Sequence, residues 1–333
     1  MNTNINFNHK TVLITGGAGF IGSNLAFHIK EKYPQSNIVI FDSFRSDEKF
    51  SNGNLKSFGH YKNLVGFNGE IICGCINSIS DLALLNKYKF DYIFHHAAIS
   101  DTRIYDQEMV MRTNVNSFYN ILELAKKNNA GLVYASSAAT YGSSPSPQSI
   151  GKESPENPYG FSKLLMDQIA VRYSKENPKI SLVGLRFFNV YGPGEFFKNK
   201  TASMVIQLGH QILSGQPPRL FEGSDKIKRD FINILDVIQA NLNACKPKQN
   251  GVYNVGTGNP RSFQDIADIL QKELDTNLGN DYIPNPHNGY QFHTQADISS
   301  SIENLNFHPK ISLEDGIRAY IPEIKRLHNQ NNQ

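Results

Sequence analysis

The chain is poor in the features that mark secreted, membrane or nucleic-acid-binding proteins. It has three cysteines in 333 residues, too few for a disulfide framework, and Cys73-Gly74-Cys75 lacks the second pair of ligands that a zinc site needs. No apolar run approaches the roughly 18 residues of a membrane span, and the polar start MNTNINFNHK makes no signal peptide. The net charge is only +3, with scattered lysines and arginines. We therefore expect a reduced, cytoplasmic protein with no metal site and no membrane or nucleic-acid partner.

The segments of the first half predict a doubly wound α/β fold. A chain of 333 residues is too long for one small core and suggests two lobes. Apolar strands that alternate with helices indicate a parallel sheet covered on both faces, joined by right-handed crossovers. The expected strands are 11–15, 38–41, 70–75, 92–95, 132–135 and 180–185. The helical patterns that separate several of them cover 20–30, 106–127 and 161–174.

This alternation breaks up after about residue 190, where glycine and proline divide shorter elements. We therefore predict a dinucleotide-binding Rossmann domain formed by 1–190 plus about 231–255. A smaller mixed α/β lobe for the substrate is predicted from about 191–230 plus 256–333.

A glycine-rich turn follows the first expected strand directly, in Thr15-Gly16-Gly17-Ala18-Gly19-Phe20-Ile21-Gly22. The spacing fits Gly17-x-Gly19-x-x-Gly22 or Gly16-x-x-Gly19-x-x-Gly22. Either provides one glycine for the tight turn, one for close approach to phosphate and one for helix packing. The pyrophosphate of a dinucleotide would then lie at the positive end of the next helix.

Asp42 stands twenty residues beyond Gly22, where a carboxylate accepts hydrogen bonds from the adenosine ribose. That position favours NAD, because a 2′-phosphate beside a carboxylate would be repelled. Arg45 and Lys49 lie close by and would neutralise such a phosphate, although solvated loop charges are equally common there. These residues leave the choice between NAD and NADP open.

Tyr159 is the one tyrosine of fifteen with a lysine, Lys163, four residues downstream. On a helix the two side chains share one face. An ammonium ~4 Å from a phenolate contributes about 4 kcal/mol at an effective dielectric of ~20. We therefore expect the pKa of Tyr159 to fall from its usual ~10 toward neutrality, as an acid/base catalyst requires. Ser137, at the end of an expected strand, is the preferred group to position a substrate hydroxyl, with Ser136 as its neighbour.

Several longer motifs carry a family resemblance. GGAGFIG, HHAA at 95–98, ASSAATYG at 135–142, YGFSK and RFFNVYGPGE at 186–195 resemble the extended short-chain dehydrogenase/reductase superfamily. KNKTASM at 198–204, RLFEGSDKIKRDF at 219–231, YNVGTG at 253–258 and YQFHTQAD at 290–297 are similar to the ADP-L-glycero-D-manno-heptose 6-epimerase family. The resemblance runs from about residue 10 to 325.

The resemblance implies a reaction and a set of roles. Members of the family invert C6 of ADP-glycero-manno-heptose, for the lipopolysaccharide inner core, by transient oxidation with bound NADP. Their reaction uses two bases, which match Tyr159 and Lys198 here. The implied cofactor contacts are Gly16, Gly19, Phe20, Ile21, Gly22, Asp42, Ser43, Lys49, His96, Ala97, Ala98, Ile99, Ser100, Asn114 and Lys163. The implied substrate contacts are Asn189, Val190, Lys200, Phe221, Glu222, Gly223, Ser224, Arg229 and Tyr290. Relatives also imply a homo-oligomer.

Two positions depart from the family and three other functions are open. Cys75 stands where many relatives carry an aspartate that meets the cofactor adenine, and Arg103 replaces a smaller hydroxylated residue. A 4-epimerase would need only one tyrosine and free rotation of the sugar, but KTASM and FEGS argue against it. A 4,6-dehydratase would need an acid pair where Ala138 and Ala139 stand. A dinucleotide sensor without activity would not need Tyr159 and Lys163 together.

Overall fold

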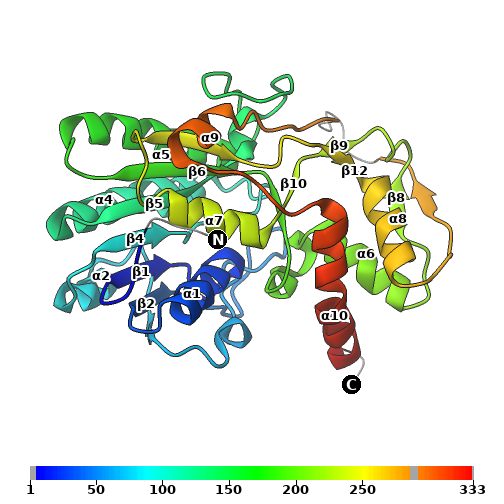
Figure 1. The fold of residues 1–333 in the computed structure, drawn as a ribbon, viewed down its shortest axis with the longest axis horizontal. Coiled ribbons are helices and arrows are strands. Elements are labelled where there is room, and N and C mark those ends of the chain that lie inside the picture. The colour runs from blue at the N-terminus through cyan, green and yellow to red at the C-terminus, as the bar shows by residue number, and fades with distance from the viewer. Residues whose placement is uncertain (1–4, 286–291, 332–333) are drawn as a thin grey trace.

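A seven-stranded parallel sheet forms the centre of the molecule (Figure 1). The computed structural model describes residues 5–285 and 292–331. The strand order is β11-β6-β5-β4-β1-β2-β3, and it reverses direction between β1 and β4, where doubly wound folds bind their ligands. The strands are β1 Thr11–Thr15, β2 Asn37–Asp42, β3 Glu70–Cys73, β4 Tyr92–His95, β5 Gly131–Ser137, β6 Leu182–Phe187 and β11 Gly251–Val255. The predicted doubly wound α/β fold is confirmed.

The strands are apolar on both faces because helices cover both faces. Val12 and Ile14 of β1 pack into one core, and Leu13 between them packs into the other. Helices α1 and α7 cover the first face, whereas α4 and α5 cover the second. The helices are α1 Phe20–Lys32, α2 Ile79–Ala83, α3 Gln107–Val110, α4 Ser117–Asn128, α5 Pro158–Glu176, α6 Met204–Leu213, α7 Ile234–Asn243, α8 Phe263–Glu273, α9 Ser299–Leu305 and α10 Leu313–Asn331.

Besides shifts at the ends of other elements, three differences between the expected and the observed elements stand out. The first is the seventh strand, β11, which was not among the expected strands. The second is β3, which ends at Cys73, two residues earlier than expected. The third is the single helix expected over 106–127, which is divided into α3, a π-helical turn at Met111–Asn116 and α4. Asn114 lies in this π-helical turn, and its side chain bonds both the backbone N–H and the carbonyl of Ile99. The expectation of one regular helix did not include this turn.

A separate hydrophobic core lies under α6, α8 and α10, on the right of Figure 1. Short strand pairs accompany it: β7 Asn189–Tyr191 with β10 Phe231–Asn233, β8 Arg219–Phe221 with β13 Asp281–Ile283, and β9 Lys228–Arg229 with β12 Arg261–Ser262. Part of the segment predicted for the smaller lobe packs elsewhere, because Leu305 and Phe307 belong to the core of the sheet. The exact division into two lobes stays a prediction.

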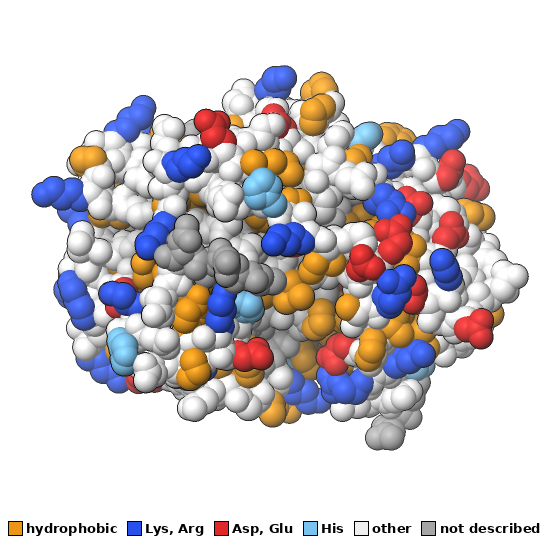
Figure 2. All heavy atoms as spheres, viewed as in Figure 1, with side chains coloured by type: hydrophobic (Ala, Val, Ile, Leu, Met, Phe, Trp, Pro, Cys, Tyr) orange, Lys and Arg blue, Asp and Glu red, His pale blue; other side chains and the backbone are white. Residues whose placement is uncertain are grey.

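Charges of both signs are interspersed on the face drawn in Figure 2. Among the described residues, no helix combines the length and the apolar character that crossing a bilayer requires.

Candidate active site

A cavity of about 590 Å³ extends along the carboxyl ends of the central strands. The sequence-predicted residues that line it come from the glycine turn, the ends of β2 and β4, β5, α5, and the segment after β6. They are Gly16, Gly19, Phe20, Ile21, Gly22, Asp42, Ser43, His96, Ala97, Ala98, Ile99, Ser100, Ser137, Tyr159, Lys163, Asn189, Val190, Lys198 and Arg229. The structure therefore brings the predicted catalytic residues together with most of the predicted cofactor contacts.

The glycine turn between β1 and α1 is packed too tightly for side chains. Gly16 has a φ of 69°, and a Cβ there would lie 2.6 Å from the backbone nitrogen of Ala97. A Cβ on Gly22 would lie 2.4 Å from the carbonyl oxygen of Gly16. Gly19 caps α1 without a side-chain acceptor, so the first turn of the helix presents its N–H groups to the cavity. We call this turn the phosphate cradle, because its N–H groups suit a phosphate.

Asp42, at the end of β2, is buried and holds the turn in place. One carboxylate oxygen accepts from the N–H of Ala18 at 2.9 Å, and the other accepts from the N–H of Phe44 at 2.8 Å. Burial raises the pKa of Asp42, and these two bonds oppose the rise. Lys49 lies outside the cavity lining, whereas Lys56, which sequence analysis did not single out, contributes to it beside Ser43.

The two histidines at the end of β4 occupy different surroundings, since His95 is buried and His96 is half-buried. His95 lies 2.7 Å through Nδ1 from the hydroxyl of Thr15, and its ring stacks near Phe118. His96 lines the cavity, and burial, with the charge of Lys163, lowers its pKa to about 3, so it is neutral. Nowhere in 5–285 or 292–331 do three His, Cys, Asp or Glu side chains gather as metal ligands would.

Tyr159, Lys163 and Ser137 meet at the junction of β5 and α5. The side chain of Asn157 caps α5 by accepting from the N–H of Gly160 at 2.8 Å. Tyr159 and Lys163 are 9% and 2% exposed. The ammonium of Lys163 donates to the carbonyl of Ala135 at 2.7 Å and lies 5.9 Å from the centroid of the Tyr159 ring.

The predicted fall in the pKa of Tyr159 is wrong, because the groups of the protein itself raise this pKa. Burial raises the pKa of Tyr159, a hydrogen bond with Ser137 lowers it, and the charge of Asp167 raises it further. Burial also lowers the pKa of Lys163 to about 8, against the opposing charge of Asp167. The desolvation of both groups, which helical spacing cannot reveal, outweighs their mutual attraction.

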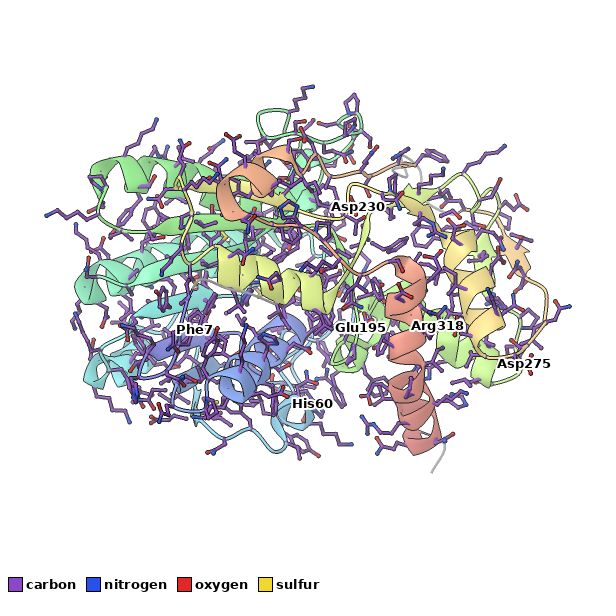
Figure 3. The ribbon with its side chains drawn as sticks, viewed as in Figure 1. Phe7, His60, Glu195, Asp230, Asp275 and Arg318 are labelled. Atoms are coloured by element: carbon purple, nitrogen blue, oxygen red, sulfur yellow. The ribbon has the colours of Figure 1, made fainter. Side chains whose placement is uncertain are left out.

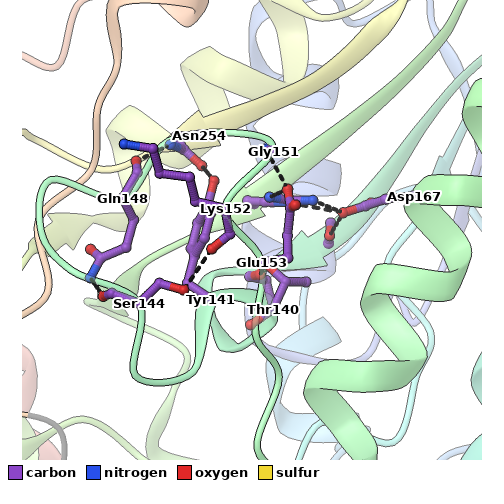
Figure 4. Close-up of polar contacts among 12 residues, drawn as sticks. Thr140, Tyr141, Ser144, Gln148, Gly151, Lys152, Glu153, Asp167 and Asn254 are labelled. Atoms are coloured by element: carbon purple, nitrogen blue, oxygen red, sulfur yellow. Dashed lines mark hydrogen bonds and ion pairs between the residues drawn. The ribbon is translucent and has the colours of Figure 1, made fainter.

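A buried polar network surrounds Asp167, four residues after Lys163 on α5, and Figure 4 shows Asp167 and Glu153 in it. Asp167 of α5 accepts from the hydroxyls of Tyr134 and Ser136 at 2.8 and 2.9 Å. The guanidinium of Arg186, from β6, lies 2.9 Å from Asp167 and 2.6 Å from Glu153. Sequence analysis missed this network, although an aspartate four residues after Lys163 on the same helix was a signal.

The Lys198 loop, residues 195–201, contributes Lys198 and Thr201 to the cavity lining. Glu195 is buried, and its carboxylate accepts from the N–H of Gly192 at 3.1 Å and from the N–H and hydroxyl of Ser203 at 2.6 and 2.8 Å. The ammonium of Lys198 lies 5.6 Å from the ring centroid of Phe20 in the glycine turn. Burial lowers the pKa of Lys198, and the charge of Glu195 opposes this effect.

Other predicted contacts lie outside the cavity lining or outside the described residues. Asn114 is buried and outside the cavity lining, where it bonds the backbone of Ile99 in the loop after β4 and the hydroxyl of Ser162 of α5. Lys200 is exposed, and Tyr290 lies outside the described residues. The FEGS segment does not line the cavity either: Phe221, Glu222, Gly223 and Ser224.

The cavity, the phosphate cradle and the buried tyrosine–lysine pair define a dinucleotide-binding α/β enzyme of the short-chain dehydrogenase/reductase type. The sequence matches that class over residues 12–256: the chain belongs to the NAD dependent epimerase/dehydratase family.

Two relatives are similar over nearly the whole chain. The ADP-L-glycero-D-manno-heptose-6-epimerase of Brachyspira hyodysenteriae is 34% identical over 322 residues, 95% of this chain and 98% of the relative. The crystal structure of the Helicobacter pylori ADP-L-glycero-D-manno-heptose-6-epimerase has a TM-score of 0.90 and 47% identity, covering 98% of this chain and 99% of that one. The resemblance inferred from the sequence motifs is confirmed.

More distant structures share the fold. The UDP-glucuronic acid 4-epimerase of Bacillus cereus, solved in complex with NAD, has a TM-score of 0.79 and 28% identity, covering 96% of this chain and 99% of that one. The UDP-glucose 4-epimerase of Thermotoga maritima has a TM-score of 0.83 at 24% identity, covering 95% and 99%, so it supports the fold alone.

Proposed function

We propose that this protein inverts C6 of the heptose in ADP-D-glycero-D-manno-heptose to give the L-glycero epimer, for lipopolysaccharide synthesis. The observation that carries the proposal is that two proton-transfer groups from separate elements, Tyr159 of α5 and Lys198 of the Lys198 loop, line one dinucleotide cavity. Inversion through a carbonyl needs a group on each side, since the hydroxyl occupies different positions in the two epimers. The 47% identity to the Helicobacter pylori enzyme supports the same substrate.

A nicotinamide dinucleotide is the cofactor, and the residues present fit it. Gly16 and Gly22 allow the backbone to pack closely where a Cβ would clash, and the start of α1 presents uncapped N–H groups for the pyrophosphate. When bound, the oxidised dinucleotide would supply the hydride acceptor and a positive charge.

We further propose that the dinucleotide is NADP. Both carboxylate oxygens of Asp42 are already engaged by the N–H groups of Ala18 and Phe44, so the carboxylate serves the backbone of the turn. Lys56 lines the same end of the cavity and would neutralise a 2′-phosphate. Lys56 pairs with Glu48 at 2.9 Å, an ion pair on the surface that a phosphate can displace at little cost.

Each of the chain's own groups has a distinct task. The hydroxyl of Tyr159 exchanges a proton with the C6 hydroxyl of one epimer, and the Nζ of Lys198 does so for the other. Ser137 holds the substrate hydroxyl near Tyr159, and its own hydrogen bond lowers the pKa of Tyr159. The charge of Lys163 favours the phenolate whenever Tyr159 gives up its proton. Arg229 lines the substrate side of the cavity and provides a cation for the ADP phosphates.

The alternative functions have weaker support. A 4,6-dehydratase would need an acid pair at the positions where this chain has Ala138 and Ala139. A 4-epimerase would not need Lys198. A dinucleotide sensor would not need to bury Tyr159 and Lys163 at the cavity. The homo-oligomer and the cytoplasmic location stay predictions.

The function is tested with ADP-D-glycero-D-manno-heptose that carries deuterium on C6. The expected result is inversion of C6, followed by NMR, with deuterium retained on the sugar. Loss of deuterium to solvent, or no inversion, would overturn the proposal, and UDP-glucose serves as the control substrate for 4-epimerisation. Chromatography of the nucleotide released by denaturation identifies the cofactor; NAD in place of NADP would overturn only the cofactor assignment.

A further inference from the structure

The Lys198 loop has to be held from outside, because its backbone is irregular. The segment Phe196–Thr201 is a 3-10 turn interrupted at Asn199, which has a φ of 52° and a ψ of −126°. Such a conformation is costly for a residue other than glycine and persists only when its surroundings fix it. The position of the Lys198 ammonium depends on these contacts.

One contact is a flat stack between His60 and Phe197. The ring centroids are 3.8 Å apart and the planes differ by 4°. His60 precedes a 3-10 turn at Tyr61–Leu64, and its Nδ1 accepts from the N–H of Lys62 at 3.1 Å, which fixes the orientation of the imidazole. Burial, with the charges of Arg45 and Lys62, lowers the pKa of His60, so the stacked ring is neutral at physiological pH.

The same histidine is tied to the glycine turn. The backbone N–H of His60 donates to the carbonyl of Ala18 at 3.0 Å, and Asn63 donates to the same carbonyl at 3.1 Å. The guanidinium of Arg45 donates to the carbonyl of Phe197. The stack therefore connects the phosphate cradle with the residue next to Lys198.

The far side of the Lys198 loop is held by other rings and by a buried carboxylate. Phe196 meets Phe197 edge-on, at 5.1 Å and 81°, and packs on His210 of α6 at 5.7 Å. Figure 3 shows Glu195 toward α10 and His60 on the side of the sheet. The Lys198 loop thus lies between α6, which contacts Phe196, and the segment that carries His60, which contacts Phe197. His60 connects the loop to the glycine turn through its bond to Ala18.

We propose that His60 is a positioning residue for Lys198, acting through its stack on Phe197. The inference rests on the proposed function, in which Lys198 is the second proton-transfer group. His60 itself does not line the cavity. Its effect on the reaction therefore passes through the position of the Lys198 loop, where a displacement of about 1 Å is enough to cost up to ~100-fold in rate.

The test is a double-mutant cycle on C6 inversion, followed by NMR, with His60→Ala, Lys198→Met and the double variant. His60→Ala is expected to lower kcat at least tenfold with an unchanged KM for the ADP-sugar and unchanged cofactor content. His60→Phe, which keeps a planar ring, should restore kcat to within about threefold. Tyr119→Ala is the control, because it removes an exposed ring of α4 that has no ring contact with His60 or Phe197 among the described residues.

The decisive result is the effect of His60→Ala in the Lys198→Met background. If His60 acts through Lys198, the double variant and Lys198→Met alone should differ in kcat by less than about twofold. A full tenfold loss in that background, or no rescue by His60→Phe, would overturn the inference and leave the proposed function standing. A Lys198→Met variant with the wild-type rate would instead overturn the role of Lys198 in the proposed function, and this inference with it.

Discussion

Replacing Lys163 with methionine is expected to stabilise the fold at neutral pH while removing activity. Lys163 is 2% exposed, and burial lowers its pKa from 10.5 to about 8. Since a tenfold change in proton affinity is worth about 1.4 kcal/mol, the charged amine costs the folded state about 3 kcal/mol below pH 8. Methionine avoids this cost but loses the hydrogen bond to Ala135, worth about 1–2 kcal/mol. The expected net gain at pH 7 is about 1–2 kcal/mol.

The sign of the pH dependence makes this prediction specific. Between pH 8 and pH 10.5 the unfolded chain binds the Lys163 proton more tightly than the folded protein does, so stability rises with pH there. Wild type should therefore gain about 2–3 kcal/mol relative to Lys163→Met between pH 7 and pH 10. Reversible urea unfolding at equal cofactor content measures the difference, with the exposed Lys126→Met as control. A difference that does not change with pH would refute the reasoning.

Three further outcomes test other parts of the site. Tyr159→Phe should lower kcat at least ~100-fold, the usual contribution of proton transfer, and normal turnover would remove Tyr159 from the mechanism. Asp167→Asn removes one of the two carboxylates that contact the buried guanidinium of Arg186 and should lower the free energy of unfolding by up to about 3–5 kcal/mol. Glu108→Gln, in an exposed ion pair, should change it by less than about 1 kcal/mol; equal losses would contradict the burial argument. Gly16→Ala places a Cβ 2.6 Å from backbone nitrogen and should reduce the cofactor released on denaturation; full occupancy would contradict the proposed cradle.

The parts of the site that depend on neighbours in sequence could be predicted, and those that depend on long-range contacts could not. The spacing of Tyr159 and Lys163 placed both on one helix face, which the structure confirms. The partner of the Lys163 ammonium is the carbonyl of Ala135, 28 residues away on another element, and no local pattern identifies it. Asp42 likewise stood at the expected place, but whether its oxygens face a ligand or the backbone depends on how the loop after β2 returns.

The same distinction explains why the direction of the Tyr159 pKa was wrong. Spacing along a helix tells which groups attract each other, whereas the cost of desolvation depends on everything that surrounds them. Tyr159 and Lys163 are buried at the junction of β5 and α5, so the cost of desolvation exceeds the attraction. A calculation from the pair alone therefore gave the wrong sign.

The arrangement of buried charges shows how the protein tolerates a lysine in this position. Asp167 and Glu153 each contact the guanidinium of Arg186, so two carboxylates balance the two cations of this region. The negative charge of Asp167 raises the pKa of Lys163 and keeps it from falling further. Yet Lys163 itself forms no ion pair among the described residues, because its ammonium donates to a neutral carbonyl. Its charge is therefore supported from the interior without being neutralised, and it stays available to the cavity in which we propose that Tyr159 releases a proton.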